Sequence, residues 1–118
     1  MAVILFKETY NDIEQYKEYY VVTRDDKYGI VSKTDGSVVI PMEYEALIPV
    51  GEDKIVVQKG DKYGIIDIKG NVILPIEYDK IRPIEKKRLF YREIKFFAKK
   101  GDTYKSYKLN ELESGNYD

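Results

Sequence analysis

The sequence predicts an all-β protein built from repeated, short antiparallel strands. Twelve tyrosines and a high content of β-branched residues favour strands over helices. Short apolar runs alternate with turns that contain glycine or aspartate, which is typical of hairpins. One pattern also recurs at a nearly constant period. We therefore expect a single domain of about three units of 34–35 residues, each with three short strands.

The repeat is visible in two markers. "DDKYGI" at residues 25–30 returns as "GDKYGI" at 60–65, and "VVIPMEYEALIP" at 38–49 matches "VILPIEYDKIRP" at 72–83. Toward the C-terminus, "KKGDTYKSY" at 99–107 lies over "QKGDKYGII" at an offset of 41, so the third unit has about seven additional residues. We place the units at about residues 3–36, 37–70 and 71–109, with a tail at 110–118.

Each unit is expected to contain three strands in a fixed order. The first is "YYVVT" or "KIVVQ", and a tight turn at "DD" or "GD" follows it. The second is "YGIVS" or "YGIIDI", followed by a turn in which glycine supplies a positive φ. The third is "VVI" or "VIL", which we expect to end at Pro41 or Pro75 because proline cannot donate to the ladder.

The N-terminal part of the chain gives two further expectations. Ile13, Tyr16 and Tyr20 have helical spacing, which predicts a short helical turn around Asp12–Tyr16. The segment Val3–Phe6 aligns with a third strand that lacks its own unit, and Tyr104–Leu109 aligns with a second strand that lacks a partner. Their pairing would close the fold and remove an exposed edge; the alternative is an open meander.

Glycine inside the second strand indicates a bulge or a close approach by another group. We expect a tyrosine ring to cover the backbone there, whereas in the alternative the glycines are only tolerated. The tyrosines that recur after each third strand, Tyr10 included, are expected to pack between units. The predicted structural residues of the repeat are Tyr28, Gly29, Pro41, Tyr44, Tyr63, Gly64, Pro75 and Tyr78.

This pattern of Lys-Tyr-Gly, a strand, a glycine turn, "VIP" or "ILP" and then Glu-Tyr resembles the bacterial WG repeat, also called the KWG repeat. Tyr28 and Tyr63 stand where that family usually has tryptophan, and the third unit reads Tyr104-Lys105 without the glycine. The resemblance implies an all-β repeat domain from bacteria or their phages. It also implies a role in interactions, with no shared catalytic residues.

The composition excludes several classes of site. The chain has no cysteine and no histidine, so disulfides, the usual zinc sites and catalytic triads are unavailable. Asp25, Asp26, Glu52 and Asp53 lie at predicted turns, where acidic residues are common for backbone reasons. We expect no cofactor, no metal and no enzymatic activity. The short apolar start fits neither a signal peptide nor a spanning helix, so we expect a cytoplasmic protein without membrane contact.

The charges point to one segment. Residues 1–79 hold 9 basic and 15 acidic residues, a net charge of −6, whereas residues 80–108 hold 11 and 3, a net charge of +8. Within residues 84–100, cations alternate with aromatic residues. The predicted partner-binding residues are Lys86, Lys87, Arg88, Phe90, Tyr91, Arg92, Lys95, Lys99 and Lys100.

The expected partner of this segment is a protein with an acidic surface. A nucleic acid is the alternative, because such segments also bind phosphates and stack on bases. In a third interpretation the segment is an elongated strand whose aromatics are core and whose lysines protect an edge. The function we expect is a non-enzymatic binding module, such as an inhibitor, immunity protein or anti-defence protein. A homodimer also remains open.

Overall fold

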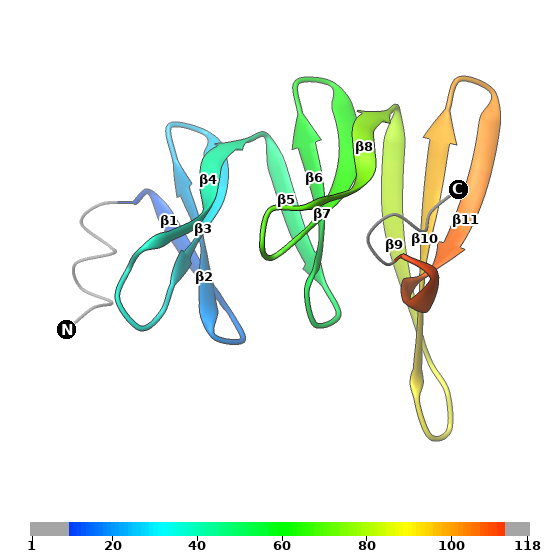
Figure 1. Ribbon diagram of the computed structural model, residues 1–118, viewed down its shortest axis with the longest axis horizontal. Helices are drawn as coiled ribbons and strands as arrows, with labels where there is room; N and C mark the ends of the chain where they lie inside the picture. The colour runs from blue at the N-terminus through cyan, green and yellow to red at the C-terminus, as the bar shows by residue number, and fades with distance from the viewer. Residues whose placement is uncertain (1–9, 113–118) are drawn as a thin grey trace.

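Three antiparallel sheets stand in a row in the computed structural model, which describes residues 10–112 (Figure 1). The first sheet contains β1 (Asp12–Tyr16), β2 (Tyr19–Arg24), β3 (Lys27–Ser32) and β4 (Val38–Tyr44). The second contains β5 (Ala46–Val50), β6 (Lys54–Lys59), β7 (Lys62–Asp67) and β8 (Val72–Tyr78). The third contains β9 (Lys80–Lys87), β10 (Arg92–Lys100) and β11 (Thr103–Lys108), followed by a short 3-10 helix at Leu109–Glu111. The predicted all-β repeat meander is therefore confirmed.

The first two sheets have four strands, one more than each predicted unit. The expectation that the third strand ends at its proline is wrong, because β4 continues through Pro41 and β8 through Pro75. The segment after each of these strands then forms the first strand of the next sheet. All four prolines of the chain lie on strands that form the edge of a sheet, where a missing N–H costs no ladder bond.

The helical turn predicted around Asp12–Tyr16 is also wrong, because these residues form β1. Each of them pairs with a residue of β2, from Asp12 opposite Thr23 to Tyr16 opposite Tyr19. Lys17 makes the connecting turn with a φ of 54°. It occupies the position of Gly51, which has a φ of 67° in the equivalent turn of the second sheet. Sheet pairing therefore overrides the local helical spacing.

The strand glycines admit a close approach, but the group that approaches is not an aromatic ring. A Cβ atom at Gly29 would lie 2.6 Å from the Ile40 carbonyl oxygen and 2.6 Å from Met42 Cγ. At Gly64 it would lie 2.7 Å from Ile76 Cγ1 and 2.8 Å from the Leu74 carbonyl oxygen. The fourth strand bulges at this point, so its own backbone and an aliphatic side chain lie against the glycine.

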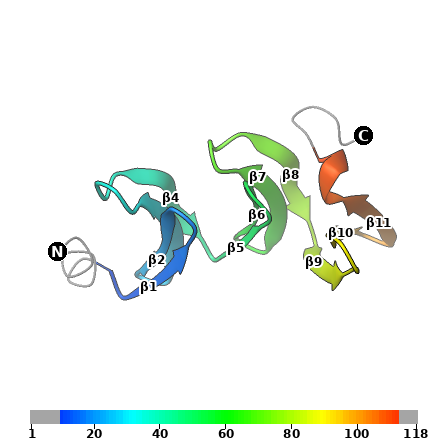
Figure 2. The same cartoon turned by 90° about the horizontal axis from the view of Figure 1, so that it is seen from below.

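Side chains on both faces of the second sheet are buried. One face packs on the first sheet, where Ile30 and Tyr44 share a core with Leu47 and Val57. The other packs on the third sheet, where Val56 and Ile65 share a core with Ile81 and Phe96. Figure 2 shows the sheets following one another along the row. Residues 10–112 therefore cover only one of the two faces of the third sheet.

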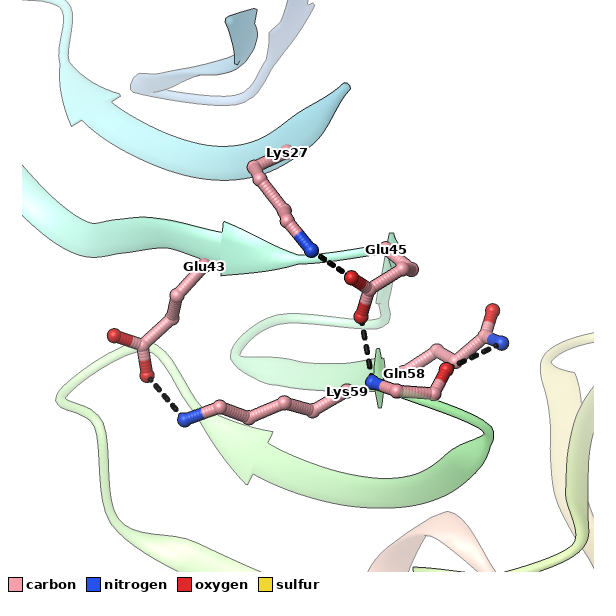
Figure 3. A network of polar contacts seen from close by, with 6 residues as sticks. Lys27, Glu43, Glu45, Gln58 and Lys59 are labelled. Atoms are coloured by element: carbon pink, nitrogen blue, oxygen red, sulfur yellow. Dashed lines mark hydrogen bonds and ion pairs between the residues drawn. The ribbon is translucent and has the colours of Figure 1, made fainter. Parts of the chain in front are cut away.

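An acidic residue lies at each junction between sheets, and Figure 3 shows the first of them, Glu45. Glu45 pairs with Lys27 of the preceding sheet, and it accepts a hydrogen bond of 2.6 Å from the Gly60 N–H of the following sheet. Asp79 repeats this arrangement, with Lys62 Nζ at 2.7 Å and the Gly101 N–H at 2.8 Å. The bonds from Lys62 and Gly101 lower the pKa of Asp79. The Lys of the Lys-Tyr-Gly step therefore ties each sheet to the next.

The predicted closure of the fold concerns Val3–Phe6, which lie outside the described residues. One observation bears on the other end of that pairing. In the third sheet, Lys105 occupies the position that Gly29 and Gly64 hold in the first two sheets. Since a Cβ at those glycines would clash with the bulged fourth strand, a strand with the same bulge does not fit beside Lys105. Among residues 10–112, only β10 pairs with β11.

Candidate functional site

The additional residues of the third unit form a projecting hairpin, which we call the arm (residues 84–93). β9 and β10 are eight and nine residues long, against five and six for β5 and β6. They remain paired out to Lys87 and Arg92. The turn between them is closed by a hydrogen bond of 2.7 Å from the Arg88 N–H to the Tyr91 carbonyl. The arm extends past the turns of the other two sheets on the same side of the molecule (Figure 1).

The strand register assigns every side chain of the third sheet to one of two faces. Residues directly opposite each other share a face, and neighbours along a strand alternate. Phe96 belongs to the face packed on the second sheet and is 0% exposed, whereas the adjacent Phe97 points the other way and is 43% exposed. The second face, which we call the outer face, carries Arg82, Ile84, Lys86, Glu93, Lys95, Phe97, Lys99, Tyr104, Ser106 and Lys108. Lys80 lies opposite Lys99 but is not counted with this face, because its Nζ donates a hydrogen bond to the Tyr63 hydroxyl of the second sheet.

The outer face combines positive charge with exposed apolar groups. It holds five cations and one carboxylate, and the Tyr104 ring is 71% exposed. Lys99 Nζ lies 5.7 Å from the centre of the Tyr104 ring. Glu93 binds Arg88 at 2.5 Å, and this hydrogen bond lowers the pKa of Glu93. Near the arm, Ile84, Lys86, Glu93, Lys95 and Phe97 line a hollow of about 160 Å³.

The predicted binding residues divide into three groups. Lys86, Lys95 and Lys99 lie on the outer face. Lys87, Arg92 and Lys100 lie on the opposite face, where Lys100 bonds to Glu77 at 2.5 Å and has a raised pKa through that bond. Arg88, Phe90 and Tyr91 form the turn of the arm, together with Leu89.

Sequence reasoning did not include several residues of the outer face. Arg82, Tyr104 and Lys108 lie outside the segment 84–100, and Phe97 lies inside it but was not selected. Period-two alternation, read from the repeat alignment across all three strands, would have found them. Arg82 is equivalent to Ile48, and Lys108 is equivalent to Asp67, so two cations replace residues of the repeat that are not basic.

The acidic pairs lie at turns. Asp25 and Asp26 have φ values of 54° and 66° and connect β2 to β3, and the Asn11 side chain accepts a hydrogen bond of 2.9 Å from the Asp25 N–H. Asp53 bonds to Lys54 at 2.9 Å beside the turn before β6. Within residues 10–112, no three acidic side chains are grouped so that they could hold a metal ion. In the same range, no helix is long and apolar enough to cross a membrane.

Comparison with known proteins identifies the repeat. The family model for the WG containing repeat matches residues 28–63 and 63–104, two consecutive copies that together cover more than half of the chain. No curated protein and no solved structure gives a significant match. The matched residues include the Tyr-Gly step at the start of each copy, the glycine turn and the junction acid. The chain therefore belongs to the family of proteins with WG-containing repeats.

Proposed function

We propose that this protein is a non-enzymatic module that binds another protein through the outer face of its third sheet. The observation that supports this most directly is that residues 10–112 leave this face uncovered, although it carries exposed Phe97 and Tyr104 among five cations. Exposed aromatic and arginine side chains on one surface are typical of the residues that contribute most to protein interfaces.

The charges define the surface that would fit. Five cations against one carboxylate favour a partner with an acidic surface, which also speeds association through electrostatic steering. The exposed apolar surface of the face includes the aliphatic side chain of Ile84 as well as aromatic rings. Burial of aliphatic surface against apolar side chains of a protein lowers the free energy, whereas base stacking uses aromatic rings. Glu93, which lies opposite Lys86 at the arm end of the face, opposes a uniform polyanion more than it opposes a mixed protein surface.

We test this with a charge reversal of the outer face, Arg82→Glu with Lys99→Glu, in protein immobilised as bait in a bacterial lysate. The wild type is expected to retain a stoichiometric partner that high salt releases, and the reversed variant is expected to lose it. Lys69→Glu, an exposed change in a turn of the second sheet, is the matched control and should retain the partner. Absence of any stoichiometric partner of the wild type would contradict protein binding.

We further propose that binding blocks the partner, as an inhibitor, immunity protein or anti-defence protein would. Support comes from the outer face, whose cations and exposed rings can cover an acidic site of a partner. Once a partner is captured, its activity is measured with increasing amounts of this protein. A stoichiometric loss of activity is expected, and unchanged activity at saturation would leave a scaffolding role in its place.

Binding of single-stranded nucleic acid is the second candidate. The rings of Phe97 and Tyr104 are exposed next to Arg82 and Lys99, an arrangement on which bases can stack beside bound phosphates. Binding of a labelled oligonucleotide would weaken steeply between about 50 and 200 mM salt. Phe97→Ala would weaken it by about 5-fold or more, since one stacked base contributes about 1–3 kcal/mol. No binding at the lower salt concentration would exclude this candidate.

A further inference from the structure

The turn of the arm carries an exposed apolar cluster, which we call the knob (Leu89, Phe90 and Tyr91). Their exposed fractions are 87%, 90% and 64%. The knob lies at the end of the arm, away from the cores that the sheets share (Figure 1). Three adjacent apolar residues at such exposure are typical of an interaction site rather than of a solvated turn.

A groove with matching properties lies beside the base of the same arm. It has a volume of about 510 Å³ and is bounded by the turns after β1 and β5, by the arm and by Leu109. Its apolar lining includes Ile48, Pro49, Val50 and Ile94. Ile48 is 43% exposed, although its neighbours in the register, Val56 and Ile65, are buried. The groove is large enough for the side chains of Leu89 and Phe90 together.

Acidic groups at the groove can receive a cation from beside the knob. Glu52 and Glu85 stand at the rim of the groove, next to Lys17 and Arg92, and Lys87 adjoins the knob on the face of the arm that lines the groove. Among residues 10–112 the rim acids have only weak partners, since Lys17 lies 3.4 Å from Glu52 and Arg92 lies 3.5 Å from Glu85 at exposed sites. Cations from another arm can therefore approach these carboxylates at little cost.

We propose that two copies of the chain form a reciprocal dimer in which the knob of each copy occupies the groove of the other. Each chain contains both halves of the contact, and the arm that carries the knob also forms one wall of the groove, so two antiparallel arms fit a two-fold arrangement. The dimer would cover the apolar groups of knob and groove together. It uses the face of the arm that holds Glu85 and Arg92, so the outer face stays free for a partner.

The test measures the mass of the purified protein in solution by sedimentation and light scattering over a wide concentration range. The wild type is expected to dimerise, and Phe90→Asp in the knob and Ile48→Asp in the groove are each expected to weaken dimerisation by at least about 10-fold. Val38→Asp, at an exposed apolar position of β4 in the first sheet, is the control and should dimerise as the wild type does. A wild type that stays monomeric at all concentrations would overturn the proposal.

Mixing the two variants gives the decisive measurement. Phe90→Asp retains an intact groove and Ile48→Asp retains an intact knob, so the mixture can form one knob-in-groove contact that neither variant forms alone. Recovery of dimers in the mixture is expected, and it also shows that both variants are folded. Failure to recover them would mean that the knobs associate with each other or act elsewhere.

A fluorescent residue in the knob distinguishes a second copy of the chain from a membrane surface as the group that covers the knob. The chain has no tryptophan, so Phe90→Trp introduces a single one, whose emission should shift to shorter wavelength as the dimer forms. A shift that appears only with vesicles containing anionic lipid would assign the knob to a membrane surface and overturn the dimer.

Discussion

Equivalent faces of the second and third sheets differ in burial, since one packs on a neighbouring sheet and the other is exposed. In the second sheet, the row Ile48, Val56 and Ile65 faces the next sheet, and Val56 and Ile65 are 1% and 0% exposed. In the third sheet the same row reads Arg82, Phe97 and Ser106, and it faces outward. Among residues 10–112, the same strand geometry therefore buries this face in one unit and leaves it uncovered in the other. The polar and charged residues on the uncovered face suit contact with water, as they do in the capping units of repeat proteins.

The comparison extends to the fourth strand. β3 and β7 contain glycine and pair with a bulged fourth strand, whereas β11 contains Lys105 and has no such neighbour among the described residues. Loss of the glycine and loss of the strand therefore go together. A unit whose outer face is uncovered by residues 10–112 needs neither the close approach nor the apolar face, so its positions are available for charge and for the arm.

The largest expected difference in stability is between alanine variants of the two neighbouring phenylalanines. Phe96→Ala should destabilise the protein by about 4 kcal/mol, because a fully buried ring leaves a cavity in the core shared by the second and third sheets. Phe97→Ala is the matched change on the outer face and should cost less than about 1 kcal/mol. Urea unfolding followed by circular dichroism measures both. Equal losses would mean that the outer face is covered.

Glycine substitution tests the role of the bulge. Gly64→Val should cost about 3 kcal/mol, because the new Cβ would lie 2.7–2.8 Å from atoms of Ile76 and Leu74 and must displace β8. At the equivalent position of the third sheet, Lys105→Val should change the free energy of unfolding by no more than about 0.5 kcal/mol. The same urea titration applies. A large cost at Lys105 would reveal a neighbour against β11.

The acidic residues at the junctions between sheets should contribute less to the free energy of unfolding than Phe96 and Gly64 do. Glu45→Ala removes the bond to the Gly60 N–H and the pair with Lys27, and we expect a loss of about 1 kcal/mol. Glu43→Ala is the control at the same junction, because Glu43 forms one exposed pair with Lys59 at 3.3 Å, and its loss should be about 0.2 kcal/mol. If both changes cost the same, general loss of negative charge would explain the effect.

The smallest effect is a pH dependence at the second junction. Because the folded-state pKa of Asp79 lies below its unfolded value of about 3.9, its contribution to stability is complete above that value. The contribution is lost as the pH falls through the folded-state pKa. The urea midpoint of the wild type should therefore fall more on acidification from pH 5 to 3 than that of Asp79→Asn. Parallel curves would show that Asp79 has the same pKa in both states.

The repeat made much of the fold predictable from local sequence. The glycine turns, the strands around Tyr28 and Tyr63, and a close approach at Gly29 and Gly64 follow from residue type and period, because turns and strand glycines are dictated by backbone conformation. The identity of the approaching group did not follow. It depends on how far the fourth strand continues past its proline, and the edge position of that strand decides this.

The basic segment was predictable as a region but not as a surface. Its charge and its additional residues stand in the sequence, and they located the arm. The register of three strands decides which cations share a face with Phe97. Two of these strands include residues outside the segment 84–100, so Arg82 and Lys108 were not predicted as part of the site. Local chemistry thus determined the turns, the repeat and the position of the charge. The pairing of distant strands decided which side chains are buried and which remain available for binding, because a register shift of one residue exchanges the two faces of a sheet.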